Sequence, residues 1–499
     1  MKYILNPYYA LKNDKKRILL SNAPSFKIPN ELAEQGIVSF LHPVFAIILS
    51  FFHGDKDLEN VIDEISDFLD EPTSVIRDLI LPLVENKENV GFVYDGNLFE
   101  FPKRTLIERE KQMPLRDYNP KEFFINENLD FKTQRLFTSP SEIRILINTK
   151  CSTDCIYCYV DRRIKDDCEI PFKRIKELIE EAKQIGVTSF NFAGSEIFLY
   201  KYWDKFAEEL LKNGYYPYLS TKIPIGSKII DRLCELGIKD IQLSIDTLID
   251  EQLCQVNKYA NPRNNSEKML LTLDRLQKKS INVAVNSVIT KYNCSIESIS
   301  HLLEQLSKFK NITIVTLNFA EKSVYKSEEE FLKFRVSLSD IETIKSFQEK
   351  YKDNYKFEIV IPGVTKKESF INSKEEKSKN FTTRGLCTAG TRQICILPDG
   401  KVTICEELYW HPKFIIGDVL NNSIQEIWNS SGALSLVNPS QNNFSNDSIC
   451  KSCNNFEICR MGAGVCYSDI ISLYGEDKWD YPSPECPKAP KPNYVSYFE

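Results

Sequence analysis

The chain has 499 residues, of which 42% are hydrophobic, and its formal net charge at pH 7 is −6. It is too long for one ordinary hydrophobic core, so we expect two to four domains, and its acidic balance argues against broad nucleic-acid binding, which needs a basic face. No apolar run approaches the roughly 18 residues of a membrane helix, and the N-terminus lacks a signal-peptide core, so we expect a cytoplasmic protein with no membrane partner.

Residues 1–105 have the pattern of a small α+β domain. Short strands are expected at 3–5, 17–20 and 25–28, and helices at 42–52, 58–69 and 72–86. A hairpin is expected next, with strands at 90–94 and 98–101 around the turn Asp95-Gly96. Strands, three helices and a terminal hairpin together predict a winged helix-turn-helix.

DNA binding is the common function of that motif. The predicted recognition helix 72–86, however, carries Arg77 against Asp78 and Glu85, which is a poor surface for phosphates. The segment resembles instead the leader-peptide recognition domain of peptide-modifying enzymes. In those proteins a leader peptide adds a strand to an exposed sheet edge.

Residues 106–141 are charged and are predicted to form a surface linker. From 142 to 320 the pattern becomes regular, with apolar strand-like runs alternating with amphipathic helices. Strands are expected at 143–147, 187–193, 215–221, 238–246, 281–289 and 311–319. Helices are expected near 171–185, 201–213, 227–236, 264–279 and 296–309. This alternation predicts parallel strands with right-handed crossovers, and chemistry at their carboxyl ends.

Three cysteines follow the first of these strands at the spacing CxxxCxxC, namely Cys151, Cys155 and Cys158. Three thiolates on one loop can hold a cubane iron–sulfur cluster whose fourth iron has no protein ligand. A structural zinc site would need a fourth ligand close by, and only Cys168 is near.

This loop resembles that of radical S-adenosylmethionine (radical SAM) enzymes. The resemblance implies an α/β fold with a partial (β/α)6 barrel, a [4Fe-4S] cluster whose open iron is chelated by S-adenosyl-L-methionine, and reductive cleavage of that cofactor to a 5′-deoxyadenosyl radical. It places Tyr157 near the adenine. It also implies an external electron donor such as flavodoxin or ferredoxin.

The ends of the predicted strands carry polar residues that resemble the family's cofactor contacts. Gly194, Ser195 and Glu196 stand where the family usually has Gly-Gly-Glu, although Ile197 replaces the usual proline. The later strands supply the other expected contacts, which are Ser220, Lys222, Ser244, Asp246 and Asn286. Each residue alone could be an ordinary strand-end or capping residue. Their recurrence at successive strand ends favours a cofactor site.

Residues 321–385 are strongly charged and are predicted to form a bridge with one helix near 328–350. The remaining segment, 386–499, contains eight of the fifteen cysteines. Paired zinc ribbons are one interpretation of such spacing, but beside a radical SAM loop iron–sulfur clusters are favoured.

This segment resembles the SPASM domain, which holds auxiliary [4Fe-4S] clusters in radical SAM enzymes that modify peptides and proteins. By that resemblance one cluster takes Cys387, Cys405 and Cys466, and the other takes Cys450, Cys453, Cys459 and Cys486. The six residues between Cys459 and Cys466 depart from the usual three. Cys395 is expected to complete the first cluster. Otherwise that cluster would have an open iron.

Glu406 follows Cys405 directly, and an acidic residue beside a cluster cysteine acts as base in sulfatase maturases. Glu406 is therefore a candidate catalytic base, or else a solvated turn carboxylate.

The resemblance covers nearly the whole chain. It predicts a radical SAM maturase of a ribosomally made precursor peptide, forming a thioether from a cysteine sulfur to a carbon. Carbon–carbon crosslinking, epimerisation and a protein substrate of the sulfatase type remain open. A redox-sensing winged-helix regulator is the non-enzymatic alternative.

Overall fold

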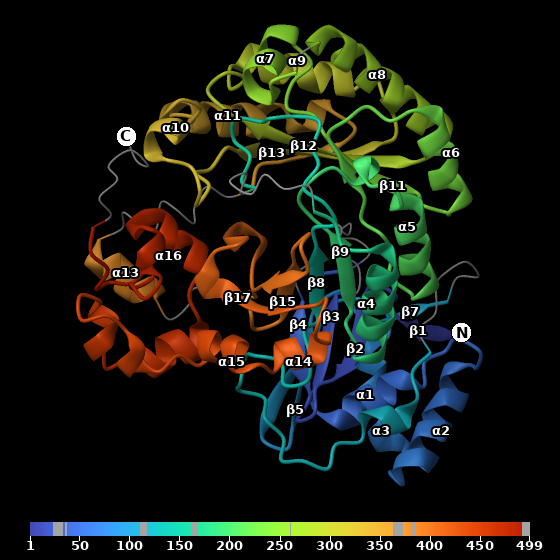
Figure 1. The fold of residues 1–499 in the computed structure, drawn as a ribbon. Coiled ribbons are helices and arrows are strands. Elements are labelled where there is room, and N and C mark those ends of the chain that lie inside the picture. The colour runs from blue at the N-terminus through green and yellow to red at the C-terminus, as the bar shows by residue number, and fades with distance from the viewer. Residues whose placement is uncertain are drawn as a thin grey trace.

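The structure is a computed structural model that describes residues 1–22, 33–34, 37–109, 117–160, 168–259, 261–362, 373–381 and 385–491. Figure 1 shows three parts, with the N-terminal part in blue below the central strands, the green and yellow barrel above and to the right, and the orange and red C-terminal part to the left. Among the described residues, no helix combines the length and the hydropathy needed to cross a membrane.

The N-terminal domain contains a three-stranded antiparallel sheet in the order β2-β3-β4. Its strands are β2 (Tyr9–Asn13), β3 (Ile18–Asn22) and β4 (Val38–Leu41). The expected strand at 17–20 is thus confirmed as β3, but its partner is β2 and not the segment 3–5. That segment, β1 (Tyr3–Leu5), pairs instead with β7 (Leu106–Glu108). The strand expected at 25–28 lies outside the described residues.

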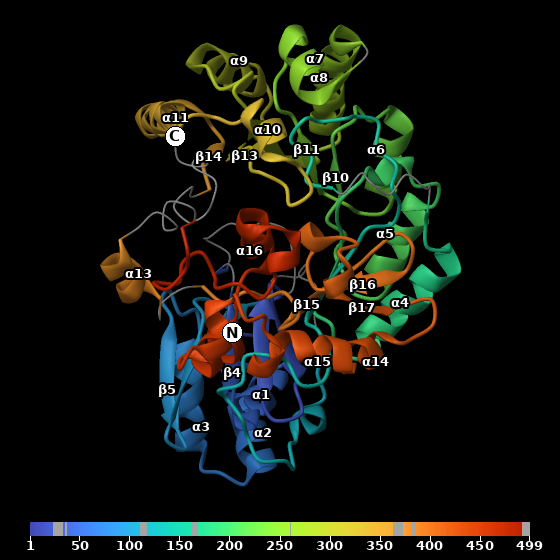
Figure 2. The same ribbon diagram turned by 60° about the vertical axis from the view of Figure 1, so that its left-hand side comes forward.

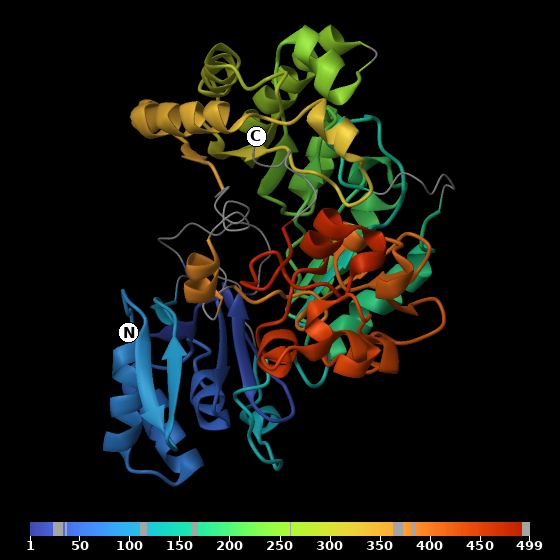
Figure 3. The ribbon, with the colours of Figure 1, turned by 90° about the vertical axis from the view of Figure 1, so that its left-hand side faces the viewer.

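The helices of this domain are α1 (Pro43–Ser50), α2 (Leu58–Leu69) and α3 (Thr73–Ile80), close to the predicted positions. Pro82 lies in a 3₁₀ turn, Leu81–Leu83, and α3 ends before it because proline cannot continue the backbone hydrogen bonding. The predicted hairpin is confirmed as β5 (Val90–Tyr94) and β6 (Asn97–Phe101), and Figure 3 shows it in light blue beside the helices.

The barrel strands are present at all six predicted places. They are β8 (Glu142–Ile145), β9 (Ser189–Phe192), β10 (Ser220–Thr221), β11 (Asp240–Ser244), β12 (Asn282–Ile289) and β13 (Ile312–Phe319). The five predicted helices appear as α4 (Phe172–Gln184), α5 (Trp203–Lys212), α6 (Ser227–Glu235), α8 (Pro262–Lys278) and α9 (Ile296–Leu306). A further helix, α7 (Asp250–Asn257), was not expected. Strand β10 is shorter than predicted, and Pro217, which has no N–H for a ladder, stands just before it.

The parallel strands fall into two five-stranded sheets. One has the order β10-β11-β12-β13-β14, in which β14 (Glu358–Val360) is a parallel neighbour of β13. The other has the order β17-β16-β15-β8-β9, in which β15 (Gln393–Ile396) is a parallel neighbour of β8. The C-terminal domain therefore extends the sheet of the barrel on the side of β8.

The structure adds detail to three of the predicted segments. The N-terminal domain extends to Glu108, because β7 pairs with β1. The segment 117–141 is not only a surface linker, since the side chains of Phe123 and Leu136 are buried in it. The bridge 321–385 contributes β14 to the barrel, and its single predicted helix is two, α10 (Glu328–Leu332) and α11 (Leu338–Tyr351).

The C-terminal domain continues from β15 into β16 (Lys401–Thr403) and β17 (Ile415–Asp418), followed by α14 (Ile424–Trp428), α15 (Ser431–Val437) and α16 (Tyr467–Tyr474). A short helix, α13 (Lys374–Asn380), precedes it. Figure 2 shows α14 and α15 beside the N-terminal domain and α16 facing the barrel. Trp428, fully buried, donates from Nε1 to the carbonyl of Leu136 at 3.0 Å and so ties this domain to the segment before β8.

Candidate active site

A cavity of about 1110 Å³ opens at the carboxyl ends of the barrel strands. Alternate residues of β11 and β12 line it with polar groups, among them Gln242, Ser244 and Asn286, while Leu243 and Val285 point to the buried helix side. Ser244 and Asn286 are register partners on neighbouring strands. The polar positions predicted from separate strand ends therefore lie along one cavity wall.

The cysteine loop forms one end of this cavity, and Cys151, Cys155 and Cys158 all line it. Thr153 Oγ1 lies 3.4 Å from the sulfurs of both Cys151 and Cys155. Asn257, at the end of α7, donates to the Cys155 sulfur at 3.4 Å. Neither Thr153 nor Asn257 was found from the sequence, because α7 was not predicted and a single threonine or asparagine has no distinguishing pattern.

Asp246 is the buried acceptor below this end of the cavity. Its Oδ2 accepts hydrogen bonds from Tyr157 Oη at 2.5 Å, Asn257 Nδ2 at 2.6 Å and Lys222 Nζ at 2.8 Å. Its Oδ1 accepts from the backbone N–H of Val288 at 2.9 Å. Asp246 thus holds Tyr157 and Lys222, which line the cavity, and its own contact with the cofactor stays a prediction.

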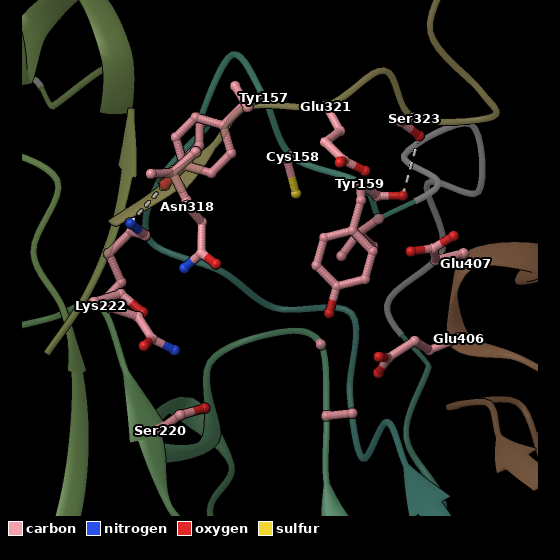
Figure 4. A pocket seen from close by; sticks show the side chains of 18 of the residues that line it. Tyr157, Cys158, Tyr159, Ser220, Lys222, Asn318, Glu321, Ser323, Glu406 and Glu407 are labelled. Carbon is pink, nitrogen blue, oxygen red and sulfur yellow. Dashed lines mark hydrogen bonds between the residues drawn. The ribbon is translucent and has the colours of Figure 1, made fainter. Parts of the chain in front are cut away.

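Lys222 and Tyr157, which Asp246 holds by hydrogen bonds, both line the cavity (Figure 4). Lys222 Nζ also donates to Tyr157 Oη at 2.7 Å. Burial opposes the charge of Lys222, but Asp246 and Cys155 outweigh it and the pKa of the ammonium is raised. A lysine that stays charged here gives the cavity a positive group near the cysteine loop.

Glu196 lines the cavity and also makes hydrogen bonds to the end of β10, while its predicted cofactor contact stays a prediction. Its carboxylate accepts from Thr221 Oγ1 at 2.8 Å and from the backbone N–H of Lys222 at 3.1 Å, and only 2% of the residue is exposed. Burial raises its pKa, which these hydrogen bonds oppose. Since β9 and β10 belong to different sheets, Glu196 ties their carboxyl ends together.

The neighbouring backbone fits the expected cofactor. Gly194 has φ +77°, and a Cβ there would lie 2.8 Å from Leu146 Cγ, so only glycine fits. Ser195 Oγ is buried against the cavity wall and has no hydrogen-bond partner among the described residues. An unpaired hydroxyl beside a glycine turn can receive a polar group of S-adenosylmethionine, and Lys222 and Asn286 on the opposite strands can bind others.

Glu406 and Glu407 line the other side of the cavity (Figure 4). Glu406 forms an ion pair with Arg144 of β8, and Glu407 accepts from Ser468 Oγ at 2.5 Å. Burial raises the pKa of Glu406, while Arg144 lowers it. Glu406, the predicted base, therefore lies in the cavity and is mostly buried, and it is not a solvated turn residue. Its carboxylate is paired with the guanidinium of Arg144.

Four basic side chains line the cavity, and they differ in whether an acceptor in the protein already binds them. Lys222 is paired with Asp246, Arg144 with Glu142 and Glu406, and Lys322 donates to the carbonyl of Ser472 at 3.2 Å. Arg335, on the segment between α10 and α11, lines the cavity with a buried Nη1 that has no hydrogen-bond partner among the described residues. It was missed because it lies in the segment interpreted as a bridge.

The first auxiliary set brings Cys387, Cys405 and Cys466 together. The pKa of Cys466 is raised. The largest cause is its hydrogen bond with Cys387, and the second largest is burial. Burial raises the pKa of Cys405 to about 12, with Glu407, Glu406 and Cys387 adding to it. Thiols are the ligands of iron–sulfur clusters, but the described residues contain no group of three side chains already arranged round a metal ion, so ligation by these cysteines stays a prediction.

Cys395, the predicted fourth ligand, lies on β15 and is fully buried. It packs with Leu146, Leu397 and Tyr409 in a small apolar cluster. Burial raises the pKa of its thiol well above the ordinary value, and Glu406 and Cys405 add to this. Its sulfur is thus near Cys405, and its ligation of the first cluster stays a prediction.

The second auxiliary set comprises Cys450, Cys453, Cys459 and Cys486. Burial raises the pKa of Cys486, and the charges of Cys459, Cys450 and Cys453 raise it further, so the four thiols share one neighbourhood. Gln441 holds the loop by donating to the carbonyls of Cys450 at 2.9 Å and Cys453 at 3.0 Å. The predicted set is suited to one fully ligated cluster.

Two sequence families match the chain. The radical SAM superfamily matches residues 145–293, and the SPASM iron–sulfur cluster-binding domain matches residues 387–454. Mycofactocin maturase MftC of Mycobacterium tuberculosis (strain CDC 1551 / Oshkosh) is 21% identical over 342 residues, which cover 67% of this chain and 80% of the relative. These matches confirm the two domains, and with them the [4Fe-4S] clusters and S-adenosylmethionine expected as cofactors.

Similar solved structures include Streptococcus suis SuiB bound to precursor peptide SuiA. The TM-score is 0.61 at 15% identity, and the alignment covers 97% of this chain and 98% of that chain. SuiB bound to S-adenosylmethionine gives the same values. At this identity the likeness confirms the fold over nearly the whole chain.

Proposed function

The chain contains a radical SAM domain followed by a SPASM domain, and from this premise we propose that it modifies a ribosomally made precursor peptide by forming a thioether. The observation that carries the proposal is one large cavity lined both by the three cysteines of the radical SAM loop and by Cys466 and Glu407 of the auxiliary region. A substrate in that cavity would contact both. SuiB, which has the same fold, was crystallised with its precursor peptide.

The bound cluster and S-adenosylmethionine would supply a 5′-deoxyadenosyl radical. Joining a cysteine sulfur to a carbon then removes one hydrogen atom, which the radical takes, one proton and one electron. We expect Glu406 to take the proton, and the support for this role is that its carboxylate lines the cavity and that burial raises its pKa against the lowering effect of Arg144. The electron would pass to the auxiliary clusters. Arg335 is suited to hold a carbonyl or carboxylate of the peptide.

The N-terminal domain would bind the leader of the precursor. Among the described strands β5 pairs only with β6, so its outer edge is open to strand addition. Val93 and Leu98 are cross-strand neighbours on this hairpin and are 78% and 63% exposed. DNA binding is less well supported, since Arg77 on α3 forms a two-pronged ion pair with Glu59.

The test uses the full-length protein reconstituted anaerobically with iron and sulfide. We expect about twelve irons per chain and release of 5′-deoxyadenosine under a strong reductant, both reduced or lost in Cys155→Ala. The probes for the second step are the small cysteine-bearing peptides encoded beside the gene. A thioether is expected to lower the mass by two hydrogens and to protect one cysteine from iodoacetamide.

The outcomes separate the alternatives. A loss of two hydrogens with every cysteine still alkylated would indicate a carbon–carbon crosslink, and an unchanged mass with altered chirality would indicate epimerisation. Zinc in place of iron, with no 5′-deoxyadenosine formed, would contradict the enzymatic proposal.

A further inference from the structure

The segment between Cys459 and Cys466 is longer by three residues than the spacing usual in SPASM domains. Part of it belongs to a π-helix, Glu457–Ala463, which is a rare element that is frequent at functional sites. Ile458 and Met461 on it are 72% and 45% exposed, whereas Arg460 between them is only 4% exposed. The inserted turn therefore directs a long cationic side chain into the domain.

Arg460 contacts a predicted cluster ligand directly. Its Nη2 lies 3.5 Å from the sulfur of Cys450 and also donates to the carbonyls of Asp480, at 3.1 Å, and Tyr481. Its Nε and Nη1 are buried, and the Tyr467 hydroxyl is a hydrogen-bonding neighbour of the guanidinium.

The charge of Arg460 is not neutralised by a carboxylate, because it forms no ion pair with any described acidic residue within 4.0 Å. Its side chain lines a smaller cavity of about 150 Å³, which Cys387 of the first auxiliary set and Tyr467 also line. Arg460 thus reaches from Cys450 of the second set to the cavity beside Cys387 of the first. A guanidinium stays protonated in proteins, and in a buried place its field is only weakly screened.

We propose that Arg460 raises the reduction potential of the cluster held by Cys450, Cys453, Cys459 and Cys486, so that this cluster readily accepts the electron released when the product bond forms. Reduction adds negative charge to a cluster, and hydrogen bonds to its sulfurs and nearby charge set its potential. A buried cation that donates to a ligand thiolate stabilises the reduced state. The inference rests on the cluster assignment made under the proposed function.

The test is a redox titration of the reconstituted full-length holoenzyme, followed by electron paramagnetic resonance. In Arg460→Gln we expect reduction of one auxiliary cluster to become about tenfold less favourable, a shift of about 59 mV to lower potential for one electron. Arg460→Lys, which keeps the charge but not the fork of donors, should shift the same signal less.

Lys488→Gln is the matched control. Lys488 Nζ lies 3.6 Å from the sulfur of Cys453 but is exposed, so solvent screens its charge and its loss should leave the potential unchanged. An unchanged potential in Arg460→Gln at full iron content would overturn the inference while leaving the proposed function intact. If Arg460→Gln assembles too little iron, a potential in Arg460→Lys that lies above the wild-type value would overturn it equally. Wild-type protein without iron at these cysteines would overturn the cluster assignment and the inference together.

Discussion

Asp246 is the buried charge on which the cofactor end of the cavity depends. Its side chain is fully inaccessible, and one of its oxygens accepts from Tyr157, Lys222 and Asn257. These three groups come from the cysteine loop, the end of β10 and the end of α7. One carboxylate therefore fixes three separate segments around the radical SAM loop.

We predict that Asp246→Asn lowers the free energy of unfolding by about 3–5 kcal/mol, because it leaves Lys222 as an unpaired buried charge. The affinity for S-adenosylmethionine should fall at least about tenfold, or about 1.4 kcal/mol, as Lys222 and Tyr157 lose their orientation. Denaturant unfolding and equilibrium dialysis measure the two effects. The double variant Lys222→Met, Asp246→Asn should recover part of the stability but not the affinity. An Asp246→Asn protein as stable as wild type would refute this account.

Cys395 tests whether the first auxiliary cluster has an open iron. If its thiol is the fourth ligand, Cys395→Ala frees one iron, and adding 2-mercaptoethanol should then change the paramagnetic resonance of the reduced protein. If Cys395 only packs with Leu146 and Tyr409, the variant should show an unchanged spectrum and a loss of about 1–3 kcal/mol of stability from the small cavity left behind. We expect the spectral change.

At the scale of the elements, the critical point is the gap between the two sheets. Strands β9 and β10 lie in different sheets, and Glu196 joins their ends by hydrogen bonds to Thr221 and Lys222. The turn after β9 must also pass close to Leu146, which directly follows β8. The turn 193–196, a predicted cofactor contact, thus also joins the two sheets.

Gly194→Ala should destabilise this turn by about 1–3 kcal/mol, because φ is +77° and the new Cβ would lie 2.8 Å from Leu146. We expect weaker binding of S-adenosylmethionine as well, measured by equilibrium dialysis alongside thermal unfolding. Gly226→Ala is the control, since nothing lies within 4 Å of its Cβ position and its φ is −83°. Equal effects of the two substitutions would contradict the prediction.

At the scale of the whole molecule, the N-terminal domain is joined to the barrel by buried polar contacts. Lys12 of β2, 3% exposed, donates to Ser139 Oγ at 2.6 Å and to the carbonyls of Ser139 at 3.1 Å and Pro140 at 2.8 Å. Arg17, directly before β3, donates to the carbonyl of Arg135 at 2.9 Å. A domain predicted to bind a leader is therefore held in a fixed place relative to the cavity.

Lys12 makes this junction dependent on pH. Burial lowers its pKa from 10.5 to about 7, which the charge of Asp14 opposes. Between these two values the unfolded chain binds the proton more tightly, so the stability contributed by this site rises with pH from about 7 towards 10. Lys12→Met should remove that rise, because it removes the titrating ammonium. The measurement is the unfolding midpoint of wild type and of Lys12→Met at several pH values between about 7 and 10. Midpoints that change with pH in the same way in both proteins would contradict the prediction.

The sequence by itself determined the three parts of the chain, the barrel strands and helices, and the cysteine sets. Alternation of apolar runs encodes βα units locally, and clustered thiols at fixed spacing have few other uses. The predictions that failed concern strand pairing, because they were made from local patterns alone. Isolated short strands such as β2 and β7 take their partners from distant segments, and no local pattern reports that partner.

Only the tertiary structure decided what each candidate residue does. Glu196 and Asp246 have the residue types of cofactor ligands, and the structure adds that both hold neighbouring residues by hydrogen bonds, because burial and partners from other strands determine where a carboxylate points. Asn257, Arg335 and Arg460 carry no motif, and they gain importance only because folding places them beside thiols or leaves a donor nitrogen unpaired. Such roles depend on contacts between residues far apart in the chain, which periodicity and spacing do not encode.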